Sequence, residues 1–434
     1  MNLAYFIARK VAAAGQQSFS RLILRIAVVA VALSMAVMIA STAVIRGFKN
    51  QIGEKIFGFW GHIHITSADV YRTLTESEPV SLEQDFYPAL DTIGPITYLA
   101  PLELFGRPLG QHMVRRRTHG GIRHIQVFAL KPGIIKTKEE IEGIVLKGVG
   151  RDFDWSFFDQ YLLEGERLQL QDSVASDGIL ISRQTADRLQ LQLGDRFIFY
   201  FVDRGEPLRR RFTVQGIYKT GLEEYDRKFA LVDIRKVQQL LKWRPDQVGG
   251  FEVFLDDIRD MDIFTEYIYL EILPNDLFAE SIREKFPAIF EWLGLQDINE
   301  VVIIVLMLVV SIINMVTALM ILILERTNMI GILKALGYTN WGIRKIFLYY
   351  AAYIIGLGLF WGNLIGIGLC LAQQEWKFIT LSEENYYLPY APIELDPAIL
   401  LALNGGTFLL ILLFLVLPSF LVTRISPVKA IRFK

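Results

Sequence analysis

"VVIIVLMLVVSIINMVTALMILIL", the stretch from Val301 to Leu324, decides the fold of this chain. It contains no charged residue, and 17 of its 24 residues are Val, Ile or Leu. A helix of roughly 20 residues crosses a hydrocarbon core about 30 Å thick. Each such apolar residue near the bilayer centre favours insertion by about 0.3–0.6 kcal/mol. The stretch is therefore predicted to be a membrane-spanning helix.

Three further runs without a charged residue are long enough to cross a membrane. They are Ile26–Ile45 with 20 residues, Ile346–Ala372 with 27 and Ala398–Thr423 with 26. Helices buried in soluble proteins are usually much shorter than this. We therefore predict a membrane protein with four transmembrane helices and one long segment between the first and the second.

The charges beside these runs predict the orientation of the chain. Basic residues without an acid precede the first run, and they also dominate the tail and the segment between the second and third runs. The segment Gln373–Pro397 instead carries five acidic residues and one lysine. Because positive charge collects on the cytoplasmic side, we expect both termini in the cytoplasm. The long segment and the acidic loop would then lie outside.

The long outside segment has the mixed pattern of an α+β domain. Gly61–Ser67 alternates like a half-buried strand, and Gly178–Val202 predicts a strand, a helix capped by Ser182 and a second strand. Helices are expected near Glu83–Thr92 and Asp233–Leu241.

Two segments are predicted to join this domain to the membrane. Ser281–Glu300 is helical in pattern on both sides of Pro287 and runs into the second span, so it is expected to form a stalk, with Phe48–Phe57 as its counterpart. The N-terminal segment indicates an amphipathic helix on the inner membrane surface, or simply a basic flank of the first span. The predicted parts are residues 1–47, the N-terminal amphipathic helix and first span; residues 48–297, the outside domain with its stalks; and residues 298–434, the other spans with a coupling helix at 325–337 and an outside loop at 373–397.

The chemistry that the sequence lacks excludes several classes of protein. No GxxxxGK[ST] loop is present, since the nearest spacing, Gly337 to Gly342, is followed by Ile343 instead of lysine. The four spans hold no Asp, Glu, Lys, Arg or His, which disfavours an ion- or proton-coupled carrier. No cytoplasmic basic domain is available for nucleic acid. We therefore predict that this chain is not an enzyme and has no catalytic residue.

Other polar groups have ordinary interpretations that we prefer. His62 and His64 could chelate a metal with His119 or His124, but strand histidines are usually surface residues, so no metal site is predicted. Two basic triplets, Arg115–Arg117 and Arg209–Arg211, are interpreted as solvated strand edges. Contact with anionic lipid or an acidic partner is the alternative. Polar residues inside the spans are expected to bond between helices, or less readily to line a substrate path; they are Ser311, Asn314, Thr317, Asn363, Asn404 and Thr407.

The segment between the second and third spans, Glu325–Lys345, is too long for a simple turn. Its apolar residues recur at helical spacing, and its polar residues, with Gly331, fall on the other face. Gly337 is expected to cap the end of this helix, and Thr339 or Asn340 to cap the start of the third span. We therefore predict a short amphipathic helix on the cytoplasmic face that serves as a docking element; its apolar stripe is Met329, Ile330, Ile332, Leu333 and Leu336.

The sequence "ERTNMIGILKALG" within this segment resembles FtsX-like ABC transporter permeases. The tail resembles the same family through Arg424, Pro427, Ala430 and Arg432. The resemblance implies a coupling helix that sits on a separate ATPase dimer, which would bind ATP and magnesium, so no cofactor is expected on this chain. The implied coupling residues are Glu325, Arg326, Ile330, Gly331, Leu333, Lys334, Ala335 and Gly337.

Within that family the chain looks most like the lipoprotein-releasing permeases of the bacterial inner membrane, by the size of the outside domain and the loop Tyr386–Pro397. This likeness implies a second permease, self or paralogue, together with a lipoprotein substrate and a periplasmic carrier. The short turn at Val202–Arg210 departs from the carrier-capturing hook of that family. Candidate contacts for membrane lipids or acyl chains are Met35, Met38, Ile39, Val305 and Leu308.

Two alternatives to lipoprotein release remain open at this point. One is an efflux permease of the macrolide-exporter type, although those typically carry their ATPase on the same chain. The other is a non-transporting regulator that activates a periplasmic cell-wall hydrolase.

Overall fold

The computed structural model describes residues 18–68, 77–104, 107–137, 140–170, 174–203 and 206–425. The chain divides into two compact units, each described here by itself. The helical unit comprises Met1–Gln51, Glu291–Leu381 and Tyr390–Lys434, and the sheet unit comprises Ile52–Phe290 and Ser382–Pro389. Residues 1–17 of the predicted amphipathic helix, and three of the four tail residues of the family pattern, lie outside the described residues.

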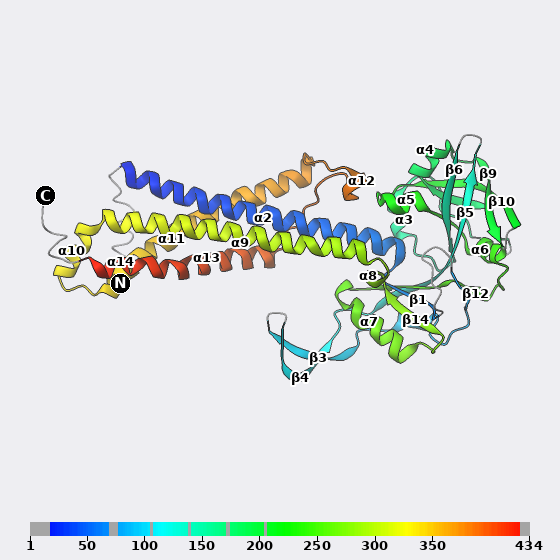
Figure 1. Cartoon of the computed structure of the whole chain (residues 1–434), viewed down its shortest axis with the longest axis horizontal. Helices are drawn as coiled ribbons and strands as arrows, with labels where there is room; N and C mark the ends of the chain where they lie inside the picture. The colour runs from blue at the N-terminus through cyan, green and yellow to red at the C-terminus, as the bar shows by residue number, and fades with distance from the viewer. Residues whose placement is uncertain are drawn as a thin grey trace. The chain divides into compact units, whose positions relative to one another are not determined.

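Four helices are long and apolar enough to cross a membrane, as predicted. They are α2 (Ser18–Trp60), α9 (Pro287–Glu325), α11 (Asn340–Trp376) and α13 (Pro397–Ser419), the last continued by α14 (Leu421–Arg424) (Figure 1). Local sequence sets their ends. Thr339 Oγ1 accepts from the N–H of Gly342 at the start of α11, and Asp396 caps α13, which has proline at its first position.

Glycines on α11 let α2 approach it closely. Gly358, Gly362 and Gly366 recur every four residues and therefore share one face. A Cβ added at Gly362 would lie 2.6 Å from the Cβ of Met35, and one added at Gly366 would lie 3.0 Å from the Cα of Ala36. Small residues at such positions allow tight helix packing where no hydrophobic driving force acts between helices.

Four of the six polar residues inside the spans form side-chain hydrogen bonds of two kinds. Asn363 and Asn404 exchange side-chain hydrogen bonds of 2.6 and 2.9 Å between α11 and α13, as expected for interhelical contacts. Asn314 and Thr317 instead donate to carbonyl oxygens of their own helix, four residues back. The prediction of interhelical bonding is therefore confirmed for the asparagine pair only.

The main sheet of the sheet unit is mixed, with strands in the order β14-β1-β13-β5-β6-β11-β8-β10-β7 and with β9 beside β10 and β5. The long strand β5 joins two halves of this sheet, because Ile122–Phe128 pairs with β13 and Phe128–Lys136 pairs with β6. The strands of the sheet are β1 (Ile63–Ser67), β5 (Ile122–Lys136), β6 (Ile141–Val149), β7 (Leu162–Gly165), β8 (Gly178–Ser182), β9 (Arg196–Asp203), β10 (Glu206–Tyr218), β11 (Phe229–Asp233), β13 (Gly250–Leu255) and β14 (Leu277–Ser281).

Short helices belong to this unit, and most of them connect strands of the sheet. They are α3 (Ser156–Tyr161), α4 (Arg183–Leu189), α5 (Glu223–Lys228), α6 (Ile234–Leu241), α7 (Met261–Tyr267), α8 (Ile282–Lys285) and α12 (Glu383–Tyr386), with two 3₁₀ turns, η1 (Ala89–Thr92) and η2 (Ile258–Asp260), and the π-helical turn η3 (Ile268–Ile272). Ser182 caps α4 by accepting from the N–H of Thr185, as predicted. The stalk is helical on both sides of Pro287, also as predicted.

The helix predicted over Glu83–Thr92 is wrong for most of its length. Only Ala89–Thr92 is helical, as a single 3₁₀ turn that follows Pro88. Proline has no N–H to donate and keeps the preceding residue out of helical geometry, so a helix cannot continue back through it.

Two small sheets stand apart from the main one. Strand β2 (Val80–Ser81) pairs with β12 (Gln247–Val248), and β3 (Thr97–Leu104) pairs with β4 (Arg107–Arg117). Figure 1 shows the β3–β4 hairpin projecting away from the main sheet.

Candidate functional site

The predicted amphipathic helix between the second and third spans is present as α10 (Thr327–Ala335). Gly337 follows it with a φ of +82°, a left-handed conformation in which glycine is least strained. The N–H of Gly337 bonds to the carbonyl of Lys334, and the N–H of Tyr338 bonds to that of Leu333. The helix and both caps therefore form as the sequence predicts.

The exposed side of α10 differs from the predicted one. Ile330 is fully buried, and Gly331, which was predicted on the polar face, is buried as well. Ile332 and Leu336, which belong to the predicted apolar stripe, are 52% and 78% exposed. The buried stripe is narrower than the apolar pattern indicated, so α10 keeps an open apolar face.

The predicted coupling residues are therefore not all on one surface. Glu325, Ala335 and Gly337 are exposed, whereas Arg326, Leu333 and Lys334 are half-buried and contribute less to any surface. Leu336, which belongs to the family's coupling-helix pattern, is exposed as well, whereas Ile332 and Trp341, each 52% exposed, were not among the coupling residues that the resemblance implied. Contiguous exposed apolar side chains mark contact surfaces for protein or membrane, and tryptophan in a polar segment was the sequence signal for this one.

Lys334 connects α10 to the end of α14. Its ammonium donates to the main-chain oxygens of Val422 at 2.8 Å, Thr423 at 3.2 Å and Ile425 at 2.7 Å. The last carbonyls of a helix lack partners within that helix, so the lysine supplies the missing donors. Partial burial lowers the pKa of Lys334 from its ordinary value. The side chain acts here as a cap that holds the C-terminal segment against α10.

Arg344, in the first turns of α11, reinforces the same junction. Its guanidinium lies 3.6 Å from the ring centroid of Phe420, and its Nε donates to Ser419 Oγ at 3.1 Å. Beside these contacts is an open hollow of about 440 Å³, lined by Lys334, Gly337, Tyr338, Thr339, Asn340, Thr423, Arg424 and Ile425. A protruding loop or side chain of another protein could enter this hollow, with Leu336 and Trp341 close to it in sequence.

The stalk helices contact each other at the far end of the helical unit. Lys49 of α2 donates to Asp297 of α9 at 2.6 Å, and the rings of Phe48 and Trp292 meet edge to face with centroids 5.5 Å apart. An exposed ion pair is worth little by itself, but the ring contact adds apolar area to it. The two helices are thus held together above the span.

A buried charged group lies in the sheet unit, where α2 ends. Lys147 of β6 is fully buried, and its ammonium lies 2.7 Å from Glu252 of β13. It also donates to the main-chain oxygen of Phe59 in the last turn of α2 and lies 4.7 Å from the ring centroid of Trp60. Burial lowers the pKa of Lys147 and raises that of Glu252, while their mutual attraction opposes both shifts. This cluster fastens the end of α2 to the sheet.

His64 extends that cluster toward the start of α9. Its Nε2 is 2.7 Å from the carbonyl oxygen of Trp60, which can only accept, so Nε2 carries the proton. Its Nδ1 then accepts from the ammonium of Lys285, two residues before α9 begins. Burial, with Lys285 nearby, holds the pKa of His64 well below its usual value, so the ring stays neutral. His62 in turn accepts from the N–H of Leu255.

The predicted lipid contacts are divided by the structure. Met35, Met38 and Ile39 are fully buried in the core of the helical unit, so these three side chains do not face lipid, contrary to expectation. The reason is the glycine face of α11, which lets that helix cover them. Val305 is 50% exposed and Leu308 is partly buried, so α9 keeps the more open apolar surface.

The turn at Val202–Arg210, which bears on carrier capture, joins β9 to β10. The two strands pair up to Asp203 and Glu206. Residues 204–205 lie outside the described residues.

Comparisons with known proteins agree with this architecture. The family model of the MacB-like periplasmic core domain matches residues 25–268, and that of the FtsX-like permease C-terminal region matches residues 301–427. The lipoprotein-releasing system transmembrane protein LolE of Haemophilus influenzae is 24% identical over 451 residues, which cover 99% of each chain. LolC of the same system and organism is 25% identical over 292 residues, covering 65% of this chain and 68% of the relative.

Solved structures also match part of the chain. One of them is the extracellular domain of the noncanonic ABC-type transporter YknZ from Gram-positive bacteria, with 14% identity and a TM-score of 0.26, covering 37% of this chain and 81% of that one. At this TM-score the likeness adds nothing to the fold assignment.

Proposed function

Because the chain belongs to the FtsX-like permeases with a MacB-like periplasmic core domain, as the sequence resemblance predicted, we propose that it moves lipoproteins out of the inner membrane toward the outer membrane. It is a multi-pass inner-membrane permease of the ABC transporter class. In the proposal a separate ATPase dimer binds ATP and magnesium, and a second permease, a copy or a paralogue, completes the complex. Both termini and α10 face the cytoplasm.

The observation that carries the ATPase contact is the open face of α10. Ile332 and Leu336 leave apolar surface exposed near the hollow that Lys334 lines together with Thr423–Ile425. An interface core of this kind, apolar with a polar rim, suits a protein partner. The ATPase would press on this surface when its two copies close on ATP.

The proposed route of force runs along the continuous helices α2 and α9. Movement of α10 passes directly into α9, since only Arg326 separates the two helices. The Lys49–Asp297 pair and the Phe48–Trp292 contact would keep α2 and α9 moving together. At the other end, Lys147 and His64 hold the last turn of α2 to the sheet, so movement of that turn would be passed to the periplasmic domain.

The substrate class rests on the relatives. LolE and LolC of Haemophilus influenzae are named as parts of a lipoprotein-releasing system, and the first of them matches along 99% of this chain. The open apolar surface of α9, which includes Val305, is the place where acyl chains would first contact the permease.

Depletion of the protein in its own organism tests this proposal. Outer-membrane lipoproteins should then accumulate in the inner membrane, and the tagged full-length chain should bring down an ATPase and a second permease. Intact lipoprotein sorting after depletion would contradict lipoprotein release. If drug efflux were lost instead, an exporter would be indicated, and a defect in cell-wall cleavage would indicate a regulator of a hydrolase.

A further inference from the structure

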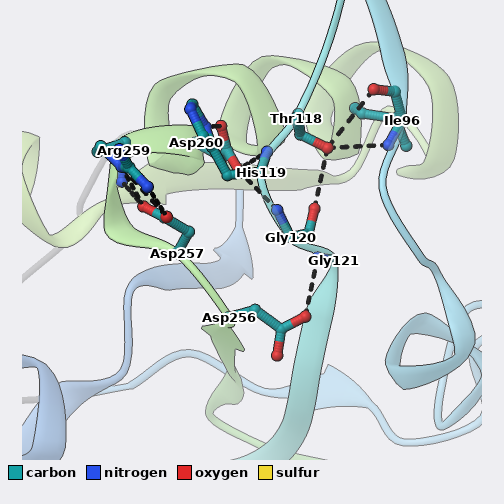
Figure 2. Close-up of polar contacts among 9 residues, drawn as sticks. All are labelled: Ile96, Thr118, His119, Gly120, Gly121, Asp256, Asp257, Arg259 and Asp260. Carbon is teal, nitrogen blue, oxygen red and sulfur yellow. Dashed lines mark hydrogen bonds and ion pairs between the residues drawn. The ribbon is translucent and has the colours of Figure 1, made fainter.

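The β3–β4 hairpin is unusual because its two strands pair with each other and, within the described residues, with no other strand. A two-stranded hairpin alone is marginally stable in water. Nevertheless, its root is fixed firmly to the sheet unit (Figure 2).

Two aspartates hold this root. Asp260, which is buried, accepts from the main-chain N–H groups of His119 at 2.6 Å and Gly120 at 3.1 Å, and lies 2.9 Å from His119 Nδ1. Asp256 accepts from the N–H of Gly121 at 2.9 Å. Figure 2 shows these carboxylates facing the chain as it leaves β4.

Thr118 ties the two strands of the hairpin to this root. Its hydroxyl accepts from the N–H of Ile96, at the start of β3, and donates to the carbonyl of Gly120, both at 2.9 Å. Each strand is therefore fixed where it leaves the domain, and the hairpin is held in a set direction while its faces remain uncovered.

One face of the hairpin combines apolar and cationic residues in a definite order. The pairs Leu99–Arg115 and Pro101–Met113 follow one another toward the tip, on the same side as Arg117. Leu99 is 63% and Met113 is 60% exposed, and the arginines are exposed as well. Successive pairs on one face are about 7 Å apart along the strand. The face therefore carries Arg117 at the root, the mixed pair Leu99–Arg115 next and the apolar pair Pro101–Met113 farther out.

We propose that this face of the β3–β4 hairpin binds the surface of an anionic phospholipid bilayer, with Met113 among the acyl chains, Leu99 at the boundary with the headgroups, and Arg115 and Arg117 at the phosphates. The apolar-to-cationic order along one axis matches the layers of a membrane surface, where apolar groups enter by about 5–10 Å. Anionic lipids attract each nearby arginine. A protein interface would instead place apolar residues in a centre surrounded by a polar rim.

The connectivity of the chain favours lipid as the occupant. The sheet unit is tethered to the bilayer on both sides, through α2 and α9. A tethered group meets its target at a high effective concentration, so weak contacts suffice for binding. The inference depends on the membrane anchoring of this domain and not on which substrate the permease carries.

The test uses the full-length chain in nanodiscs and a fluorescent probe. Cys370 is the only cysteine of the chain, so Cys370→Ala combined with Met113→Cys allows labelling of the hairpin alone with an environment-sensitive dye. In nanodiscs with phosphatidylglycerol and nitroxide-labelled lipids, the dye at position 113 should shift to the blue and be quenched. The control is the same dye at Leu163→Cys, an equally open position of β7 at 53% exposure, where quenching should be weak.

A second variant separates lipid contact from other causes. Reversing both charges with Arg115→Glu and Arg117→Glu should reduce the docked fraction on the order of tenfold, as should zwitterionic lipid alone. A blue shift without quenching would show that a protein covers the hairpin and would overturn the proposal. Equal quenching at positions 113 and 163 would overturn it as well.

Discussion

Lys334 of α10 donates a hydrogen bond of 2.8 Å to the main-chain oxygen of Val422, which lies 88 residues later in the chain. The same ammonium reaches two more carbonyls of that segment. This relationship makes the segment Val422–Ile425 part of the proposed ATPase-contacting surface. Lys334 therefore positions that surface, and its ammonium donates to carbonyl oxygens of its own chain.

Lys334→Met should loosen the C-terminal segment. Three carbonyl oxygens lose their charged donor, and hydrogen bonds to charged groups contribute about 1.5–3 kcal/mol each in favourable cases. Hydrogen exchange in Leu421–Ile425 should rise, with unfolding of the full chain easier by a smaller amount. Lys228→Met, at an exposed lysine in an i,i+4 pair, is the control and should change neither. Unchanged hydrogen exchange in Lys334→Met would show that the hydrogen bonds from Lys334 do not stabilise the segment Leu421–Ile425.

Lys147→Met should be among the most damaging single changes in the periplasmic domain. It leaves Glu252 buried without its cation, and breaking a buried pair from one side costs about 3–5 kcal/mol. The double variant Lys147→Met with Glu252→Gln should be more stable than Lys147→Met alone, because no uncompensated charge remains. Urea unfolding followed by circular dichroism measures both. If the double variant is the less stable of the two, the charges are not coupled as the 2.7 Å contact indicates.

His62 should make stability depend on pH. Burial, with Arg123 nearby, lowers its pKa from 6.5 to about 4 in the folded protein. Below pH 6.5 the unfolded chain takes up a proton that the folded chain refuses. Stability is therefore lost as pH falls from 6.5 to about 4, by about 1.4 kcal/mol per pH unit from this residue.

His62→Asn should flatten that slope. The asparagine oxygen can accept the N–H of Leu255 in place of the ring nitrogen, and it does not titrate. Unfolding free energies of both proteins at several pH values between 4 and 7 provide the comparison. Parallel slopes for the two proteins would mean that His62 is not responsible.

Gly362→Leu should disturb the contact between α2 and α11. Even the first added carbon would lie 2.6 Å from Met35 and 2.7 Å from the carbonyl oxygen of Ala32, and overpacking of a tight site costs about 1–3 kcal/mol or more. Gly368→Leu on the same helix is the matched control, because a Cβ there meets nothing within 4 Å. Resistance to unfolding in detergent should drop for the first variant only. An equal drop in both would show that helix propensity or insertion dominates.

Local features of the fold were predictable from the sequence, because local residues determine them. The uncharged run at Val301–Leu324, the caps at Ser182 and Thr339, and the left-handed Gly337 all depend on neighbours within a few positions. Hydropathy and charge also predicted that a separate domain lies between the first two spans. Pro88 is incompatible with a continuous helix over Glu83–Thr92. The prediction of that helix relied on helical pattern alone and did not take the proline into account.

Features that depend on distant partners were not predictable in this way. Nothing near Lys334 in sequence indicates that its donors satisfy carbonyls at Val422 and Ile425. The sequence around Met35 does not indicate that α11 covers this side chain, because the close approach depends on Gly362, which is distant in sequence. Ile332 and Leu336 belong to the apolar stripe of α10 and yet are exposed. An apolar pattern does not determine the width of the surface against which a helix packs.

The central claim, that the α10 end of the helical unit is where an ATPase docks, is tested most directly by two matched tryptophans at opposite ends of α11. Trp341 lies beside α10, whereas Trp376 ends the same helix on the other side of the membrane, and the two are 52% and 75% exposed. Full-length Trp341→Asp should retain on the order of a thirtieth of the ATPase that co-purifies with the unaltered chain, the loss expected of an interface hot spot of about 2 kcal/mol, while Trp376→Asp retains all of it. Equal recovery of the ATPase with both variants would contradict the account.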